Sequence, residues 1–74
     1  MKNNENVKIK GRFIRVPAGL EKTKYVWFDK NNVQFIVDSE DYTNMCRVIL
    51  HTVELNYIKL SAEELVDIIM LMEV

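Results

Sequence analysis

Apolar and polar residues alternate along the first predicted element, residues 7–16, which read VKIKGRFIRV. In an extended strand, successive side chains point to opposite faces. One face then carries the apolar or small residues Val7, Ile9, Gly11 and Phe13. The other face carries the cations Lys8, Lys10 and Arg12. The alternation slips at Ile14, so we expect a β-bulge at Gly11 or at residues 13–14; the latter would turn Arg15 to the cationic face.

Two further runs are typical of strands. Residues 24–29, KYVWFD, and residues 33–37, VQFIV, are rich in aromatic and β-branched side chains. Residues 17–23 hold the proline and the second of the two glycines, which predicts a loop. Residues 29–32, DKNN, suit a turn because Asp and Asn tolerate positive φ. We therefore expect a hairpin, with its first strand buried on both faces.

The segment 39–55 carries two conflicting signals. Six apolar residues of this segment have the spacing of one face of a helix: Tyr42, Met45, Cys46, Ile49, Leu50 and Val53. Ser39 is suited to cap such a helix, and two acids follow it in the first turn. Helix propensity is lowered by the β-branched residues Thr43, Val48, Thr52 and Val53. We predict a helix over 39–55; the alternative is a long strand from about Cys46 onward.

The last segment begins with a capping box, SAEE, in which Ser61 precedes Glu64 by three residues. A main apolar face follows at Leu65, Ile68, Ile69 and Met72. A second apolar face carries Val66, Met70 and Val74. The pattern as a whole predicts an α+β fold of the order β-β-β-α-α. In it, a three-stranded antiparallel β-meander is followed by two helices packed on one face.

Length and composition predict one small α+β domain over residues 7–74, preceded by a flexible polar tail at residues 1–6. Hydrophobic residues make up 49% of the 74, which argues against disorder. The longest apolar run, IIMLM, is far shorter than a membrane span, and the N-terminus has no apolar signal region. We expect a cytoplasmic protein with no membrane partner. Its size and its Asn- and Lys-rich composition suit an accessory protein of a phage or mobile element.

Charge is distributed unevenly although the formal net charge is −1. Residues 1–30 hold eight Lys or Arg and three Asp or Glu, a net of +5. Residues 31–74 hold two and eight, a net of −6. Such asymmetry raises the question of an anionic partner for the first half. We favour the simpler explanation that the two halves face each other, within one chain or across a dimer.

The sequence offers little for catalysis. Its one cysteine, Cys46, excludes an internal disulfide, and the set of ligands for structural zinc is missing. Cys46 and His51 are five residues apart, which brings them together on neither a helix nor a strand. No glycine-rich phosphate loop is present. We therefore expect no enzyme, no metal and no cofactor.

Association is the function that the sequence favours. A chain this small buries a smaller fraction of its surface on folding than a larger one does, so its core alone gives marginal stability. Small domains without a disulfide are often stabilised by oligomerisation. We predict a non-catalytic binding protein, self-associating as a homodimer, that occupies the surface of a protein partner as an inhibitor or adaptor does. Its predicted interface comprises apolar residues outside the main helical faces: Val48, Leu55, Val66, Met70 and Val74.

The alternative hypothesis is a binder of an anionic ligand, either nucleic acid or a nucleotide. Cations and aromatic residues are interleaved in the first half of the chain, as on sheet surfaces that hold single-stranded nucleic acid. The candidate residues are Lys8, Lys10, Arg12, Arg15, Lys24, Tyr25 and Trp27. Against this, lysines also protect sheet edges, and we expect Trp27 in the core because large aromatics dominate small cores.

Overall fold

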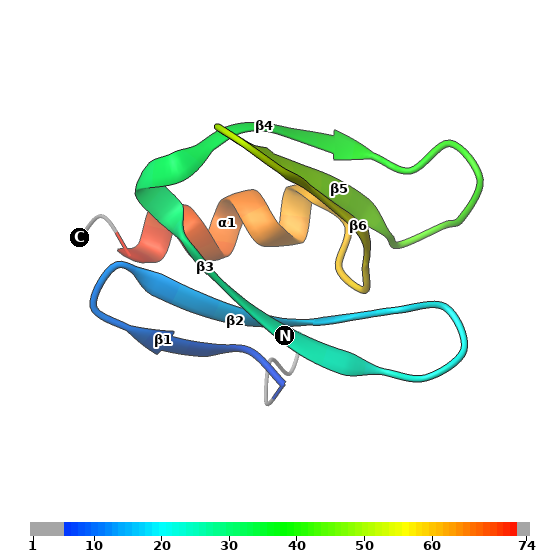
Figure 1. The fold of residues 1–74 in the computed structure, drawn as a ribbon, viewed down its shortest axis with the longest axis horizontal. Coiled ribbons are helices and arrows are strands. Elements are labelled where there is room, and N and C mark those ends of the chain that lie inside the picture. The colour runs from blue at the N-terminus through cyan, green and yellow to red at the C-terminus, as the bar shows by residue number, and fades with distance from the viewer. Residues whose placement is uncertain (1–5, 73–74) are drawn as a thin grey trace.

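The computed structural model describes residues 6–72 and contains six antiparallel strands in one sheet and a single C-terminal helix. The elements are β1 (Lys8–Lys10), β2 (Phe13–Ala18), β3 (Lys24–Asp29), the 3₁₀ turn η1 (Lys30–Asn32), β4 (Val33–Asp38), β5 (Cys46–Leu50), β6 (Glu54–Ile58) and α1 (Ala62–Met72). Figure 1 shows β1–β3 on one side, β4–β6 on the other, and α1 between them. The predicted meander with two helices is therefore wrong.

Residues 7–16 form two strands and not one bulged strand. Lys10 pairs with Phe13, so Gly11 and Arg12 make a two-residue hairpin turn. Gly11 has a φ of 59°, which is the positive value that a type II′ turn requires at its first central position. The chain reversal restarts the alternation, which explains the slip at Ile14 without a bulge. The predicted polar tail lies outside the described residues, except for Asn6.

The predicted hairpin between residues 24–29 and 33–37 is also wrong, although both strands form close to the expected bounds. Among the described residues, β3 pairs with β2 and β4 pairs with β5. The Oδ1 atom of Asp29 accepts a hydrogen bond from the backbone N–H of Asn31, at 2.8 Å, and so caps η1. The DKNN segment therefore forms a 3₁₀ turn, and the chain crosses from one half of the sheet to the other.

No helix forms over 39–55; β5, β6 and their hairpin occupy most of this segment. The strand alternative fits better, since Cys46 and Val48 are buried while Arg47 between them lies outward. Ser39 does cap a turn, because its Oγ accepts hydrogen bonds from the N–H groups of Asp41 and Tyr42. Ser39 therefore caps the backbone as predicted, but the residues after it form the β4–β5 loop and not a helix. A register shift in β5–β6 accompanies a φ of 60° at Tyr57.

The capping box of α1 is confirmed. The Oγ atom of Ser61 accepts a hydrogen bond from the N–H of Glu64 at 3.1 Å. The Glu64 carboxylate accepts one from the N–H of Ser61 at 3.0 Å. In addition, Asp38 accepts a hydrogen bond from the N–H of Ala62 at 3.2 Å. Three side chains thus satisfy backbone N–H groups at the start of α1, which fixes where the helix begins.

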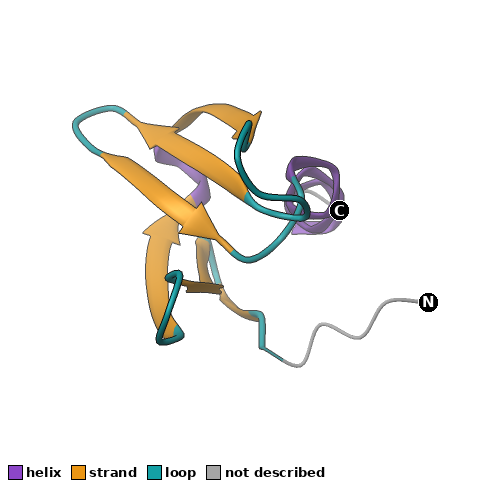
Figure 2. Cartoon of the chain, turned by 90° about the vertical axis from the view of Figure 1, so that its right-hand side faces the viewer, coloured by secondary structure: helices purple, strands orange, loops and turns teal. Residues whose placement is uncertain are grey.

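The core lies between the two halves of the sheet and α1 (Figure 2). Ala18 pairs with Ile58, which joins β2 to β6 and makes the two halves one sheet. The buried core residues are Ile14, Val16, Ala18, Phe28, Cys46, Val48, Ile58, Leu60, Leu65 and Ile68. The main apolar face predicted for the last helix packs against or within this core.

The predicted oligomer interface does not form one surface. Val48 is fully buried and pairs with Leu55 across β5 and β6, so it is a core residue. The placement of these two residues on a helix over 39–55 is therefore wrong, because they lie on the strands β5 and β6. On α1, Val66 is 39% exposed and Met70 is 62% exposed. Val74 lies outside the described residues.

Candidate functional site

The outer surface of the β1–β2–β3 half carries what we call the cationic–aromatic face, which comprises Lys8, Lys10, Phe13, Arg15, Tyr25 and Trp27. Residues paired across antiparallel strands point to the same side of a sheet. Lys8 pairs with Arg15, and Arg15 pairs with Trp27 on the next strand. The three side chains therefore form one row across the half-sheet, and the rest of the face flanks it.

The alternation within β2 directs this face away from the core. Ile14 and Val16 are fully buried, whereas the intervening Arg15 is only half-buried. The same alternation holds in β3, where Phe28 is buried and its neighbour Trp27 is not. Successive side chains of a strand point to opposite faces of the sheet. Because one set of alternate side chains is buried in the core, the other set points to solvent.

All three aromatic rings of the face are exposed. The exposed fractions are 45% for Trp27, 44% for Tyr25 and 42% for Phe13. The expectation that Trp27 belongs to the core is therefore wrong, and Phe28 takes that place. Large rings left half-exposed on one surface of a small protein are typical of binding sites.

Arg15 is held in place by Tyr25. Its guanidinium carbon lies 4.3 Å from the centroid of the Tyr25 ring, a cation–π contact. Arg15 Nη2 also lies 3.5 Å from the backbone oxygen of Asn6, and the Tyr25 hydroxyl lies 3.5 Å from the Asn6 side-chain oxygen. The Nε atom of Arg15 is buried and has no hydrogen-bond partner within the described part of the chain. No carboxylate neutralises this guanidinium among residues 6–72.

Arg12 has a different role from the other cations. Its Nε atom lies 2.7 Å from Oδ2 of Asp29, whose other oxygen caps η1. The backbone oxygen of Arg12 accepts a hydrogen bond from the N–H of Lys30 at 2.9 Å. Arg12 therefore ties the β1–β2 turn to η1, and its charge is already neutralised by Asp29.

The structure brings five of the seven candidate residues from the sequence together on one face. Lys8, Lys10, Arg15, Tyr25 and Trp27 share the face. Lys24 pairs with Ala18 and so points to the opposite side of the sheet. Phe13 was missed as a site residue because the slipped alternation placed it with the apolar side of the first strand. Recognising the Gly11–Arg12 turn would have placed it correctly.

Lys8 and Lys10 are free to meet a ligand. Both lie on the short strand β1 and are exposed. Within the described residues, neither takes part in an ion pair. Together with Arg15 they place three positive charges, which have no carboxylate partner among residues 6–72, beside three exposed rings. Such a surface can attract phosphate groups and offers rings on which flat groups can stack.

Cys46 and His51, the thiol and the imidazole singled out in the sequence, lie at opposite ends of β5. Cys46 begins β5 and His51 follows its end, so the thiol and the imidazole lie far apart. Burial, together with the nearby carboxylate of Asp38, raises the pKa of the Cys46 thiol to about 11. The ring Nδ1 of His51 lies 3.3 Å from the side-chain nitrogen of Gln34. A buried thiol with a raised pKa is a poor nucleophile.

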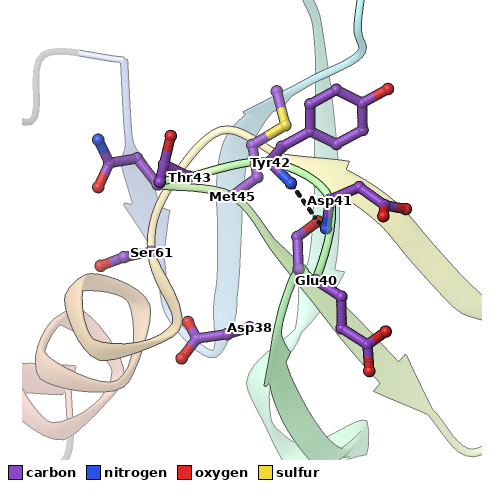
Figure 3. Close-up of a pocket in the computed structure, with 9 residues that line it drawn as sticks. Asp38, Glu40, Asp41, Tyr42, Thr43, Met45 and Ser61 are labelled. Carbon is purple, nitrogen blue, oxygen red and sulfur yellow. Dashed lines mark hydrogen bonds between the residues drawn. The ribbon is translucent and has the colours of Figure 1, made fainter.

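A hollow of about 500 Å³ lies where the β4–β5 loop meets the start of α1 (Figure 3). It is lined by Asp38, Ser39, Glu40, Asp41, Tyr42, Thr43, Asn44, Met45 and Ser61. Three of its groups already serve the backbone, because Asp38 and Ser61 cap α1 and Ser39 caps the loop. Asp38, Ser39 and Ser61 therefore help to fix the loop and the start of α1.

Two further absences concern the described part of the chain. Within residues 6–72, no three His, Cys, Asp or Glu side chains lie close enough together to hold a metal ion. Over the same residues, no helix has the length and apolar character needed to cross a membrane. The cationic–aromatic face is thus the strongest candidate site.

Comparison of the chain with protein-family models, curated proteins and solved structures finds no match in any of the three.

Proposed function

We propose that this protein is a non-catalytic binder of nucleic acid, which it holds by its phosphate chain on the cationic–aromatic face. The observation that carries the proposal is the position of Trp27. It is half-exposed in the same row as Arg15 and Lys8 instead of lying in the core. This favours the anionic-ligand hypothesis over occupation of a protein surface, which the sequence alone favoured.

The charges of the face are suited to a phosphate chain. Lys8, Lys10 and Arg15 lack carboxylate partners among residues 6–72. Cations of this kind release counterions from a nucleic acid when they bind its phosphates, which supplies most of the sequence-independent affinity. The aromatic rings beside them distinguish the face from an edge strand that merely carries lysines for solubility.

The proposal is tested by charge reversal with a matched control. A fluorescently labelled 12-nucleotide strand is titrated with the protein, and its anisotropy is measured. Lys8→Glu with Lys10→Glu is expected to weaken binding at least tenfold. Lys22→Glu with Lys24→Glu changes the net charge equally but lies off the face, so it is expected to have a much smaller effect. Equal losses in the two double variants would contradict a localised site.

Self-association is a second candidate, supported by one observation on α1. Val66, Met70 and Leu71 remain exposed on this helix, Leu71 to 73%. Apolar side chains gathered on one short helix are typical of contacts with another protein, including a second copy. This surface lies on a different element from the cationic–aromatic face. Self-association and nucleic-acid binding are therefore independent of each other.

The second candidate is tested by the mass of the protein in solution. Light scattering after size-exclusion chromatography is expected to show a dimer at tens of micromolar. Met70→Glu is expected to convert it to a monomer with unchanged thermal stability, because Met70 is exposed within one chain. A wild-type protein that is strictly monomeric at this concentration would remove the candidate.

A further inference from the structure

We propose that the bound strand is single and that one unpaired base stacks on Trp27, while Arg15 and Lys8 hold the phosphates beside it. This inference rests on the proposed function and makes it specific, because it names the class of nucleic acid and the ring that meets the base. It follows from a difference among the three exposed rings of the face, because only two of them already have a cation beside them.

Two of the three rings already have a cation near them. The Arg15 guanidinium lies over Tyr25 at 4.3 Å, and the Arg12 guanidinium lies over Phe13 at 5.4 Å. Trp27 has no such contact from any residue between 6 and 72. Trp27 is therefore the ring whose surface is open to a ligand. It also offers the largest aromatic surface, which favours stacking with a base.

The register of the strands places cations beside this ring. Arg15 lies directly opposite Trp27 on the neighbouring strand, and Lys8 lies opposite Arg15 on the next. Neighbouring strands are about 4.8 Å apart, so both cations lie within reach of the sugar–phosphate chain of a base stacked on Trp27. The contact with Tyr25 orients Arg15 before any ligand arrives, which lowers the entropy lost on binding.

A duplex does not fit this arrangement. Its bases are stacked on one another, so their flat surfaces are covered until a base is extruded at a free-energy cost. A single strand presents its bases without that cost, and stacking on an aromatic side chain tolerates any base. We therefore expect a preference for single strands with little dependence on sequence.

The test separates the base from the phosphates. One probe is an eight-nucleotide thymidine strand, and the other is an abasic deoxyribose-phosphate chain with the same number of phosphates. Trp27 is the only tryptophan in the chain, so its fluorescence reports contact at this ring alone. The thymidine strand is expected to quench this fluorescence and to bind about tenfold more tightly than the abasic chain. A duplex of the same length is expected to bind more weakly than the single strand.

Variants complete the test. Trp27→Leu is expected to reduce affinity for the thymidine strand to that for the abasic chain, while leaving the abasic chain unaffected. Phe35→Leu removes an exposed aromatic ring from β4, away from the face, and is expected to change neither affinity. If wild-type protein binds the thymidine and abasic chains equally, the stacked base is refuted while phosphate binding stands. If neither chain binds, the proposed function itself fails.

Discussion

Two glycines adopt positive φ for different physical reasons. Gly11 has a φ of 59° in the β1–β2 turn, and a Cβ atom built there meets nothing within 4 Å. Gly19 has a φ of 110°, and a Cβ atom there would clash with the backbone oxygen of Lys22. The first position requires glycine only for its positive φ, whereas the second also has no room for a side chain.

Alanine substitutions should separate these two requirements. Gly11→Ala is expected to lower the free energy of unfolding by about 1 kcal/mol, the cost of a left-handed conformation. Gly19→Ala is expected to cost about 3 kcal/mol or more, because backbone atoms must also move apart. Urea unfolding followed by circular dichroism measures both values. Equal losses would show that the Gly19 loop relaxes freely.

The buried thiol makes stability depend on pH in a defined direction. The pKa of Cys46 is raised from 9.0 to about 11, so the folded protein holds the thiol proton more tightly than the unfolded chain does. This contribution to stability is complete below pH 9 and is lost as the pH rises through 11. The stability of wild-type protein relative to Cys46→Ala is therefore expected to fall between pH 9 and pH 11 in urea titrations. A difference that stays constant over this range would contradict the assignment.

At the scale of elements, the start of α1 was predictable because its capping box is local and satisfies itself. Ser61→Ala removes the Oγ atom that accepts the N–H of Glu64 and is expected to lower the free energy of unfolding by about 1 kcal/mol. Ser61→Thr keeps the hydroxyl and should retain most of the stability. Thermal unfolding of the two variants measures the difference. Equal melting temperatures for Ser61→Ala and wild type would show that the other caps suffice.

The segment 39–55 was mispredicted because apolar spacing alone does not separate a helix from a strand hairpin. Its apolar residues follow helical spacing, yet Val48 packs in the core from the strand β5. The hairpin turn at His51–Thr52 contains no glycine, asparagine or proline to mark it. Similarly, the crossing from β3 to β4 depends on η1, where Asp29 both caps the turn and pairs with Arg12. That second contact is 17 residues away in sequence and has no local signal.

At the scale of the whole molecule, most of the candidate site was predictable from residue type. Five of the candidate residues do share one face, because side chains alternate within β1, β2 and β3 and the register between these strands aligns them. Their exposure was not predictable, since it depends on which neighbour packs against the other half of the sheet. Phe28 fills the core, which leaves Trp27 outward. The separation of Arg12 from the other cations likewise depends on a tertiary contact with Asp29.

The two arginines should therefore contribute differently to the salt dependence of nucleic-acid binding. The three cations that lack a carboxylate partner among residues 6–72 predict a slope of about −2 for log affinity against log salt concentration on a single strand. Arg15→Ala is expected to flatten this slope by about 0.7. Arg12→Ala is expected to leave it nearly unchanged, because Asp29 already neutralises Arg12. Anisotropy titrations at several salt concentrations measure the slopes; equal flattening by both variants would contradict the separation of roles.

The most direct test of the central claim is a titration of ¹⁵N-labelled protein with a single-stranded oligonucleotide, followed by heteronuclear NMR. We expect chemical-shift changes to concentrate in β1, β2 and β3 and to include the indole N–H of Trp27. We expect the chemical shifts of the exposed side of α1 around Met70 to stay unchanged. Shift changes centred on α1 or on the β4–β5 loop, or no changes at all, would contradict binding at the cationic–aromatic face.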